Sequence, residues 1–374
     1  MRVALFNDAV ELGGAERYFA DLATGVAAAG HELHIALSDR EGSRRQYHTL
    51  ARLTASIVLL PSSIRPARVA LASYIGAWRF LRALRPDIAH FSLHHADSCR
   101  YWIEAARRLH VPLLVSEHFV TDGYLQASRL TRWFKTRAYR AAQAILFNSH
   151  AARAAALSAW RGAPPRAVVI PNGVRLDEFR QNRGGRTGLR VCFLGRLVAQ
   201  KNPLAVVRAF EAVAAGFPEA TLHIYGDGPL RQTVADAAAS SPAADRVFLH
   251  GHTQNVADAL AAVDILVLPS WAENQPYSVL EAMASGCAVI ATAVGDLPNL
   301  LSDGAGVVVP PGDADALSAA LRRLLSDPQA ALETGRRAQR RVAEFHSLDT
   351  MIGAILDHYD RVLSETRHSE LAPP

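Results

Sequence analysis

Two glutamates eight residues apart, Glu273 and Glu281, lie in the apolar stretch "VDILVLPSWAENQPYSVLEAMASGCAVIAT" at residues 263–292. The pattern predicts a buried strand, a polar loop carrying Glu273, a helix with Glu281 in its second turn, and another buried strand. A carboxylate among apolar side chains needs hydrogen bonds, and sugar hydroxyls would supply them to Glu281. The helix start at Pro276 to Ser278 has free N–H groups that could hold phosphate. By spacing alone, the glutamate pair could also be coincidence.

Two cations and two glycines are candidates for holding a diphosphate. In "FLGRLVAQKNP" a buried strand ends at Gly195 and is followed by Arg196 and Lys201. Arginine could bind a phosphate through a bidentate hydrogen bond, and lysine could bind it as a point charge. A lone cation in a loop, however, is more often a solvated surface residue. Gly13 and Gly14 precede a helix, where the missing Cβ atoms would let N–H groups approach an anion. A Gly-Gly turn has an equally good structural explanation.

Polar residues also follow other predicted strands. His118 ends the strand in "PLLVSEHFVTDG", and the strand before it carries His90, His94 and His95 near its end. A histidine facing a cleft can exchange hydrogen bonds, although a lone histidine is more often structural. Thr253 could bracket a nucleobase, or simply be a loop residue. No HExxH cluster indicates a metal site, and the missing GxSxG elbow argues against a Ser-His-Asp hydrolase.

Alternating strands and helices must bring these residues together. Short apolar runs alternate with Ala-, Leu- and Arg-rich helical segments, which predicts α/β structure with parallel sheets. We expect two doubly wound, Rossmann-like domains that face each other across a cleft, with ligands beyond the carboxyl ends of the strands. The predicted divisions are a first Rossmann-like domain at 1–178, a linker at 179–189, a second Rossmann-like domain at 190–346 and a final amphipathic helix at 347–374.

Composition narrows the class of protein. A chain of 374 residues normally forms two domains. The 40 Lys and Arg against 35 Asp and Glu are too slight an excess for a nucleic-acid binder. The three cysteines show no metal-ligand spacing and fit a reducing cytoplasm. No secretory signal and no apolar run of about 20 residues are visible, so the expected location is the cytoplasm, with at most peripheral membrane contact.

A basic, aromatic segment, "SRLTRWFKTRAYR" at residues 128–140, suggests such a contact. As a helix it could rest on anionic lipid at the inner face of the cytoplasmic membrane. The cations proposed to touch lipid are Arg129, Arg132, Lys135, Arg137 and Arg140. The alternative is a solvated helix face whose aromatic side chains lie in the core.

The chain resembles the retaining nucleotide-sugar glycosyltransferases of family 4, which have the GT-B fold. The stretches that carry this resemblance are, in order, "GGAER", "VIPNGVRLDEF", "FLGRLVAQKN", "GDGPLR" and "ENQPYSVLEAMASGCAVIAT". The resemblance runs along nearly the whole chain and is densest from about 165 to 300. Its most specific element is the spacing of Glu273 and Glu281. The donor it implies is a nucleotide-diphosphate sugar, with UDP or GDP as the expected nucleotide, and no cofactor is required.

The resemblance implies that the domain at 1–178 binds the acceptor, that the domain at 190–346 binds the donor, and that the final helix crosses back to the first domain. It also implies separate roles for the site residues. Glu281 would bind the nucleotide ribose, while Arg196 and Lys201 would bind the diphosphate. Glu273 would hold hydroxyls of the transferred sugar, and His118 would contact its 6-position. The donor contacts implied in addition are Gly13, Gly14, Thr253, Asn274, Gln275, Tyr277, Ser278 and Val279. The family commonly has glycine after the first glutamate, whereas this chain has Asn274 and Gln275, which leaves the donor sugar open.

The implied reaction is front-face transfer with retention of anomeric configuration. The departing diphosphate, neutralised by Arg196 and Lys201, would help deprotonate the acceptor hydroxyl without a metal ion. A saccharide or lipid-linked saccharide would be the acceptor, in the synthesis of cell-surface polysaccharide, lipopolysaccharide or glycolipid. Two alternatives remain: another GT-B enzyme, such as a sugar-nucleotide epimerase or phosphorylase, or a non-catalytic nucleotide-sugar-binding partner.

Overall fold

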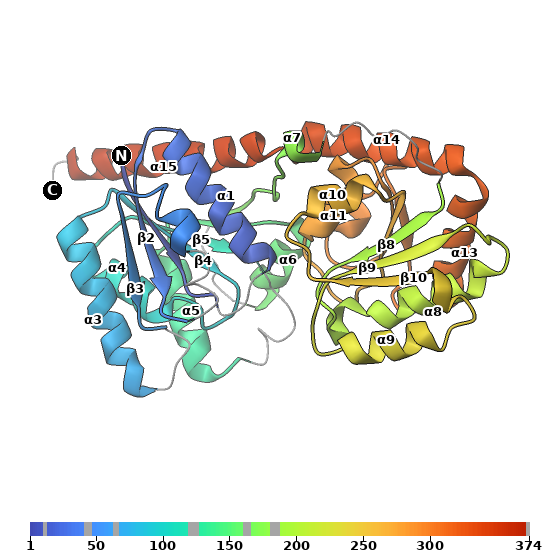
Figure 1. Ribbon diagram of the computed structural model, residues 1–374. Helices are drawn as coiled ribbons and strands as arrows, with labels where there is room; N and C mark the ends of the chain where they lie inside the picture. Colours follow the sequence, from blue (N-terminus) through green and yellow to red (C-terminus); the bar gives the residue numbers. More distant parts are fainter. Residues whose placement is uncertain are drawn as a thin grey trace. The chain divides into compact units, whose positions relative to one another are not determined.

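The computed structural model of the protein describes residues 1–9, 13–40, 47–62, 67–118, 127–159, 166–179 and 188–371. The chain divides into two compact units. The N-terminal unit comprises Met1–Asn172 and Asp349–Pro374, and the C-terminal unit comprises Gly173–Leu348. Each unit contains a parallel sheet with helices on its faces, as the sequence predicts (Figure 1).

In the described part of the N-terminal unit, seven parallel strands have the order β3-β2-β1-β4-β5-β6-β7. The strands are β1 (Arg2–Asn7), β2 (Glu32–Ser38), β3 (Ser56–Leu60), β4 (Ile88–Leu93), β5 (Leu113–Glu117), β6 (Ala144–Phe147) and β7 (Ala167–Val169). The helices are α1 (Gly14–Ala28), α3 (Ala67–Leu84), α4 (Arg100–Arg108), α5 (Arg129–Ala141), α6 (His150–Ala159) and α15 (Leu348–Leu371). Most of these strands are apolar and buried on both faces, as is typical of parallel sheets.

The two faces of this sheet differ in character. The face toward α3, α4, α5 and α6 forms an apolar core in which the rings of Phe6 and Phe91 stack at 4.5 Å, with Trp102 beside them. The opposite face lies toward α1 and α15. There, a Cβ on Gly25 of α1 would come within 2.6 Å of the Ile352 side chain of α15, so glycine permits the close approach of these two helices.

In the C-terminal unit the described strands number six and have the order β10-β9-β8-β11-β12-β13, all parallel. They are β8 (Arg190–Leu194), β9 (Thr221–Tyr225), β10 (Val247–Gly251), β11 (Ile265–Leu268), β12 (Ala288–Thr292) and β13 (Val307–Val309). The α-helices are α7 (Leu176–Phe179), α8 (Pro203–Ala214), α9 (Arg231–Ala239), α10 (Val256–Ala261), α11 (Tyr277–Ala284), α12 (Leu297–Leu300), α13 (Ala314–Ser326) and α14 (Pro328–Phe345). Short 3-10 turns occupy Ala199–Lys201 and Ala244–Arg246.

The boundary between the units falls earlier than the predicted boundary at residue 178. Helix α7, which the sequence analysis assigned to the first domain, belongs to the C-terminal unit and contacts α10 and α11. The reason is a bridge between Val174 and Ser347 of the C-terminal unit, which holds the chain there before α7 begins. Most of the predicted linker, residues 180–187, lies outside the described residues.

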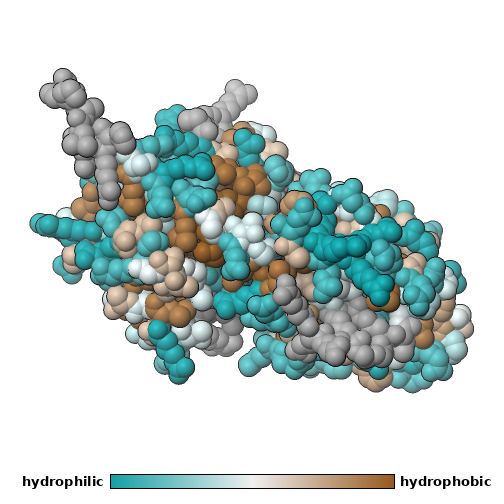
Figure 2. Space-filling view, turned by 90° about the horizontal axis from the view of Figure 1, so that it is seen from above, coloured by the Kyte–Doolittle hydropathy of each residue, from teal (hydrophilic) through white to brown (hydrophobic). Residues whose placement is uncertain are grey.

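None of the helices that the structure describes is both long enough and apolar enough to span a bilayer. Seen from above, hydrophilic and apolar side chains are interspersed over the visible surface (Figure 2).

Two helical glycines give a test of packing in these units. Gly335 of α14 lies against the turn after α11, where a Cβ would come within 2.1 Å of the Gly286 carbonyl oxygen. We therefore expect Gly335→Ala to lower the free energy of unfolding by about 1–3 kcal/mol, because overpacking outweighs the better helix propensity of alanine. Urea-induced unfolding measures this change.

The matched control is Gly353→Ala in α15. A Cβ there meets nothing within 4 Å, so this substitution should stabilise the protein by about 0.5–1 kcal/mol. Equal effects of the two substitutions would contradict the packing described for α14.

Candidate functional site

The strand order of the C-terminal unit reverses direction between β8 and β11. The chain runs from β8 outward to β9 and β10, then returns to β11 and continues outward to β12 and β13. At such a switch point the two loops beyond the carboxyl ends of the central strands diverge and leave room for a ligand. The loop after β8 carries Arg196 and Lys201, and the loop after β11 carries Glu273.

An ion pair and two hydrogen bonds join these two loops. Lys201 Nζ donates to Glu273 Oε1 at 2.5 Å. Gln200 Nε2 donates to the carbonyl oxygen of Ala272 at 2.7 Å, and the Trp271 N–H donates to the carbonyl oxygen of Gln200 at 2.8 Å. Since Glu273 is buried, its pairing with Lys201 offsets the cost of removing the carboxylate from water. The sequence singled out both residues without indicating that they touch.

The Glu273 loop is also fixed from the side of β12. Gly295 has a φ of +57°, and a Cβ there would come within 1.9 Å of the Glu273 carbonyl oxygen, so only glycine fits. The Asp296 N–H donates to the carbonyl oxygen of Asn274 at 3.0 Å. Asn274 and Gln275 are buried, and the loop is therefore held on two sides.

Helix α11 follows this loop directly. Its N-cap is Pro276, which provides no side-chain hydrogen bond, and the first residues are Tyr277, Ser278 and Val279. A helix N-terminus carries a partial positive charge and suits an anion. Glu281 lies one turn further along and is only 4% exposed. The two glutamates thus belong to different elements, one in the loop and one in the helix, as the sequence pattern predicts.

Arg196 and Thr253 lie at the same edge of the sheet. Arg196 is exposed, and its neighbour Leu197 donates its N–H to the carbonyl oxygen of Asp227 after β9, at 2.8 Å. Thr253 follows β10, the edge strand of the sheet. Its hydroxyl accepts from the Asn255 N–H at 3.2 Å and closes a local turn. Within the described residues, the side-chain hydrogen bonds of Thr253 stay inside this turn.

In the N-terminal unit the corresponding switch point lies between β1 and β4. Gly13 is the N-cap of α1, and Gly14 is the first residue of that helix. Buried Asp8, which follows β1, accepts a hydrogen bond from the Cys99 N–H at 2.7 Å and lies 3.6 Å from His94 Nε2. No sequence pattern distinguishes Asp8, since an aspartate after a strand is common in turns.

His118 follows β5 and is 9% exposed. Its Nε2 atom lies 2.9 Å from the Ser92 hydroxyl, and its ring centroid lies 4.3 Å from that of Tyr18. Burial, together with nearby His94 and His90, lowers the pKa of His118 to about 3. The imidazole is therefore neutral near pH 7 and can both donate and accept a hydrogen bond.

The structure corrects the predicted basic face of α5. Lys135 is 3% exposed and forms an ion pair with buried Glu117, because it projects into the core beside Tyr139. It therefore contributes no charge to the surface. The alternative is also wrong in part, since Trp133 is 50% exposed and Leu130 is 57% exposed.

The remaining surface of α5 combines cations with apolar side chains. The guanidinium of Arg137 lies over the Trp133 ring at 4.6 Å and pairs with Glu104 at 3.3 Å. Arg129, Arg132 and Arg140 are exposed. We call the exposed residues Arg129, Leu130, Arg132 and Trp133 the α5 patch.

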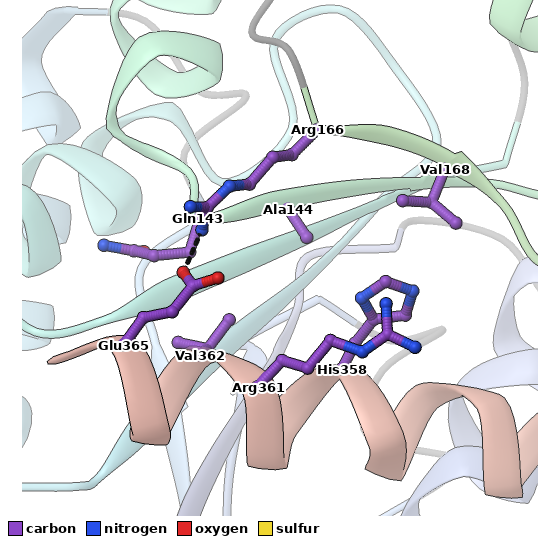
Figure 3. A pocket seen from close by; sticks show the side chains of 8 residues that line it. All are labelled: Gln143, Ala144, Arg166, Val168, His358, Arg361, Val362 and Glu365. Carbon is purple, nitrogen blue, oxygen red and sulfur yellow. Dashed lines mark hydrogen bonds and ion pairs between the residues drawn. The ribbon is translucent and has the colours of Figure 1, made fainter. Parts of the chain in front are cut away.

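A separate pocket opens between α15 and the strands β6 and β7 (Figure 3). Arg166 and Glu365 form an ion pair across it, and Arg361 and His358 of α15 line its floor. The sequence analysis did not single out any of these residues. Over the part of the chain that the structure describes, no group of three or more His, Cys, Asp or Glu side chains could hold a metal ion.

The buried histidines of the N-terminal unit predict a pH-dependent stability. Burial lowers the pKa of His90 to about 3, and burial is also the main reason that the pKa of His94 is lowered to about 4. Together with His118, these histidines take up protons on unfolding once the pH falls below the ordinary histidine pKa near 6.5. The free energy of unfolding should therefore fall as the pH drops from 6.5 to 4, by about 1.4 kcal/mol per pH unit for each histidine.

Urea unfolding followed by tryptophan fluorescence at pH 7, 6 and 5 measures this slope. Replacing one contributor, in His90→Gln, should make the slope shallower. A free energy of unfolding that does not change between pH 7 and pH 5 would contradict the burial of all three histidines.

Comparison with known proteins identifies the family. A model described as Glycosyltransferase Family 4 matches residues 12–178, and one described as Glycosyl transferases group 1 matches residues 188–327. The 2-deoxystreptamine glucosyltransferase of Streptomyces kanamyceticus is 30% identical over 211 residues, an alignment that spans 54% of each chain. The D-inositol 3-phosphate glycosyltransferase of Kineococcus radiotolerans is 26% identical over 97% of this chain and 94% of the relative.

Solved structures agree on the fold. Anabaena HepE, crystallised in complex with UDP, superposes with a TM-score of 0.82 over 96% of this chain and 100% of that chain, at 17% identity. The sucrose-phosphate synthase of Thermosynechococcus elongatus gives 0.78 over 97% and 99%, at 20% identity. The predicted fold class is thereby confirmed. The chain belongs to glycosyltransferase family 4 and has the GT-B fold.

Proposed function

We propose that the protein transfers a sugar from a nucleotide-diphosphate sugar to an acceptor hydroxyl, with retention of anomeric configuration. The observation that carries this proposal is the contact of Lys201 with Glu273 at the β8/β11 switch point. A cation suited to a diphosphate and a carboxylate suited to sugar hydroxyls are held 2.5 Å apart, as a substrate containing both groups requires.

The donor chemistry of Lys201 explains how the pair would work. An ammonium group has three N–H donors, and one of them serves Glu273. The others remain for phosphate oxygens, while the second oxygen of Glu273 remains for sugar hydroxyls. Lys201 thereby fixes the diphosphate relative to the sugar, and Arg196 adds a second positive charge. As the bond to the sugar breaks, negative charge grows on the diphosphate, and these cations stabilise it.

The other donor contacts follow the family resemblance. Glu281, buried in α11, is proposed to bind the ribose, and the N-terminal turn of α11 to receive phosphate. Neutral His118 is proposed to exchange hydrogen bonds with the 6-hydroxyl of the sugar. Gly13 and Gly14 are proposed to contact the phosphates. The nucleotide is proposed to be UDP or GDP, and similar structures were crystallised with UDP and with UDP-glucose.

The proposed acceptor is a saccharide or lipid-linked saccharide destined for the cell surface, and the proposed place of action is the inner face of the cytoplasmic membrane. The α5 patch supports this location, because Leu130 and Trp133 can enter the headgroup region while Arg129 and Arg132 meet anionic lipid. One relative is described as a teichuronic acid biosynthesis glycosyltransferase of Bacillus subtilis, at 28% identity over 62% of its length.

Thermal unfolding against a panel of nucleoside diphosphates and their sugars tests the donor site. One nucleotide should stabilise the wild type by about 2.7 kcal/mol at a concentration 100 times its Kd, with or without EDTA. Arg196→Ala and Glu281→Ala should lose most of this gain, while Arg208→Ala, an exposed arginine of α8, should keep it. If no nucleotide stabilises folded wild-type protein, a donor site at the switch point is refuted.

The same nucleotide sugar then tests transfer. Glu273→Gln keeps the shape of the side chain and removes its charge, so we expect product formation to fall by about 100-fold while nucleotide binding persists. Proton NMR of the product should show the anomeric configuration of the donor. An inverted product would contradict the retaining mechanism, and binding without turnover in the wild type would favour a non-catalytic partner.

Flotation with phosphatidylglycerol vesicles tests the α5 patch. Trp133→Ala and Arg132→Glu should each reduce the bound fraction, and added salt should reduce it further because charge contributes. The control is Trp271→Ala in the C-terminal unit, which removes another exposed tryptophan and should leave flotation unchanged. Equal flotation of all variants would rule the patch out as a membrane contact.

A further inference from the structure

A buried chain of hydrogen-bonded side chains runs through the N-terminal unit from α15 to α1. The Tyr359 hydroxyl lies 2.6 Å from His90 Nδ1, and His90 Nε2 lies 2.7 Å from the Ser116 hydroxyl. That hydroxyl in turn lies 2.8 Å from the Tyr18 hydroxyl. All of these side chains are at most 3% exposed.

Strand geometry places the chain on one face of the sheet. Side chains alternate between faces along a strand, so His90 and Ser92 of β4 share a face. Ser116 of β5 pairs in register with Ser92 and lies on that face as well. It is the face toward α1 and α15, which contribute Tyr18 and Tyr359 at the two ends.

The α1 end of the chain reaches His118. The Tyr18 ring contacts the His118 ring at a centroid distance of 4.3 Å and an interplanar angle of 62°. The Ser92 hydroxyl lies 2.9 Å from Nε2 of the same imidazole. The orientation of His118 therefore depends on where Tyr18 is held, and the chain from Tyr359 holds Tyr18.

The two hydrogen bonds of the His90 ring are coupled through its tautomer, because a neutral imidazole has one donor nitrogen and one acceptor nitrogen. Two tyrosines, one serine and one neutral imidazole bring four protons, and the chain contains three hydrogen bonds. Either Tyr359 donates to Nδ1 and the protonated Nε2 donates to Ser116, or the protonated Nδ1 donates to Tyr359 and Ser116 donates to Nε2. Removing the Tyr359 hydroxyl would therefore change the protonated nitrogen of His90 or leave that nitrogen without its partner.

Burial keeps the chain uncharged. It raises the pKa of Tyr359 and of Tyr18 well above the ordinary range, and it lowers the pKa of His90 to about 3. A fully satisfied buried network makes a core specific and rigid, although apolar side chains of the same shape could fill the space equally well. A network that ends at the side of a proposed substrate contact therefore calls for a role beyond filling the core.

We propose that Tyr359 and His90 are positioning residues that hold Tyr18 and, through its ring, fix the imidazole of His118 for the transferred sugar. The kinetic part of this inference rests on the proposed function, and the structural part does not. Tyr359 belongs to the segment that the chain reaches only after completing the C-terminal unit. The seating of α15 on the N-terminal unit thus becomes a condition for the correct orientation of His118.

NMR of the imidazole nitrogens tests the structural part without any substrate. Tyr359→Phe should shift the ring signals of His90 and also those of His118, assigned with His118→Ala. The matched control is Ile355→Val. Ile355 is buried one turn earlier in α15 and is not one of the hydrogen-bonded side chains. This substitution should leave the His118 signals unchanged. Unchanged His118 signals in Tyr359→Phe, or equal shifts in Ile355→Val, would overturn the proposal.

Kinetics of sugar transfer test the consequence. Tyr359→Phe should lower kcat by about 10-fold, since small displacements of positioned groups carry large rate penalties, while KM for the donor stays near the wild-type value. Combined with His118→Ala, it should cause no further loss, because both act through one imidazole. Additive losses, or an equal loss in Ile355→Val, would overturn the proposal. A wild-type protein that transfers no sugar would instead refute the proposed function.

Discussion

The reversal of strand order in each parallel sheet is the constraint on which the candidate site depends. In the C-terminal unit the loops after β8 and β11 leave the sheet in opposite directions, and the site residues lie where they diverge. Two hydrogen bonds through Gln200 join those loops, one to Ala272 and one from Trp271. The ion pair of Lys201 with Glu273 joins them as well, at 2.5 Å, and places a cation beside a carboxylate. The position of Gly295 then keeps the Glu273 backbone in place.

In the N-terminal unit, buried polar side chains form hydrogen bonds on one face of the sheet, whereas in the C-terminal unit the ion pair joins two loops. An apolar core lies on one face of the sheet, whereas on the other face His90 is hydrogen-bonded to Ser116, and Ser116 to Tyr18 of α1. Buried polar groups are tolerated when each finds a partner, and here the partners come from both α1 and α15. The C-terminal helix is therefore an integral part of this unit, although it is last in the chain.

Prediction from sequence succeeded where a local pattern has a single physical explanation. Apolar runs between turn residues predicted the strands, and the stretch around Glu273 and Glu281 predicted the loop and helix that carry them. The predictions failed where a residue's environment is set by distant segments. Lys135 was taken for a surface cation because helical spacing cannot reveal that Glu117, on a neighbouring strand, pairs with it in the core. The N-terminal unit ends before residue 178, where the sequence predicts the end of the first domain, because the bridge between Val174 and Ser347 joins distant segments.

The sequence by itself determined the α/β class, the family and the residues suited to a nucleotide-sugar, because strand periodicity and motif spacing are local properties of the chain. Only the tertiary structure decided which of those residues touch. It joined Lys201 to Glu273 across 72 positions and Tyr359 to His90 across 269. Such contacts depend on strand order and on how the helices pack, and no short-range pattern encodes either. The same reason explains why Trp133 is exposed while Tyr139, in the same helix, is buried.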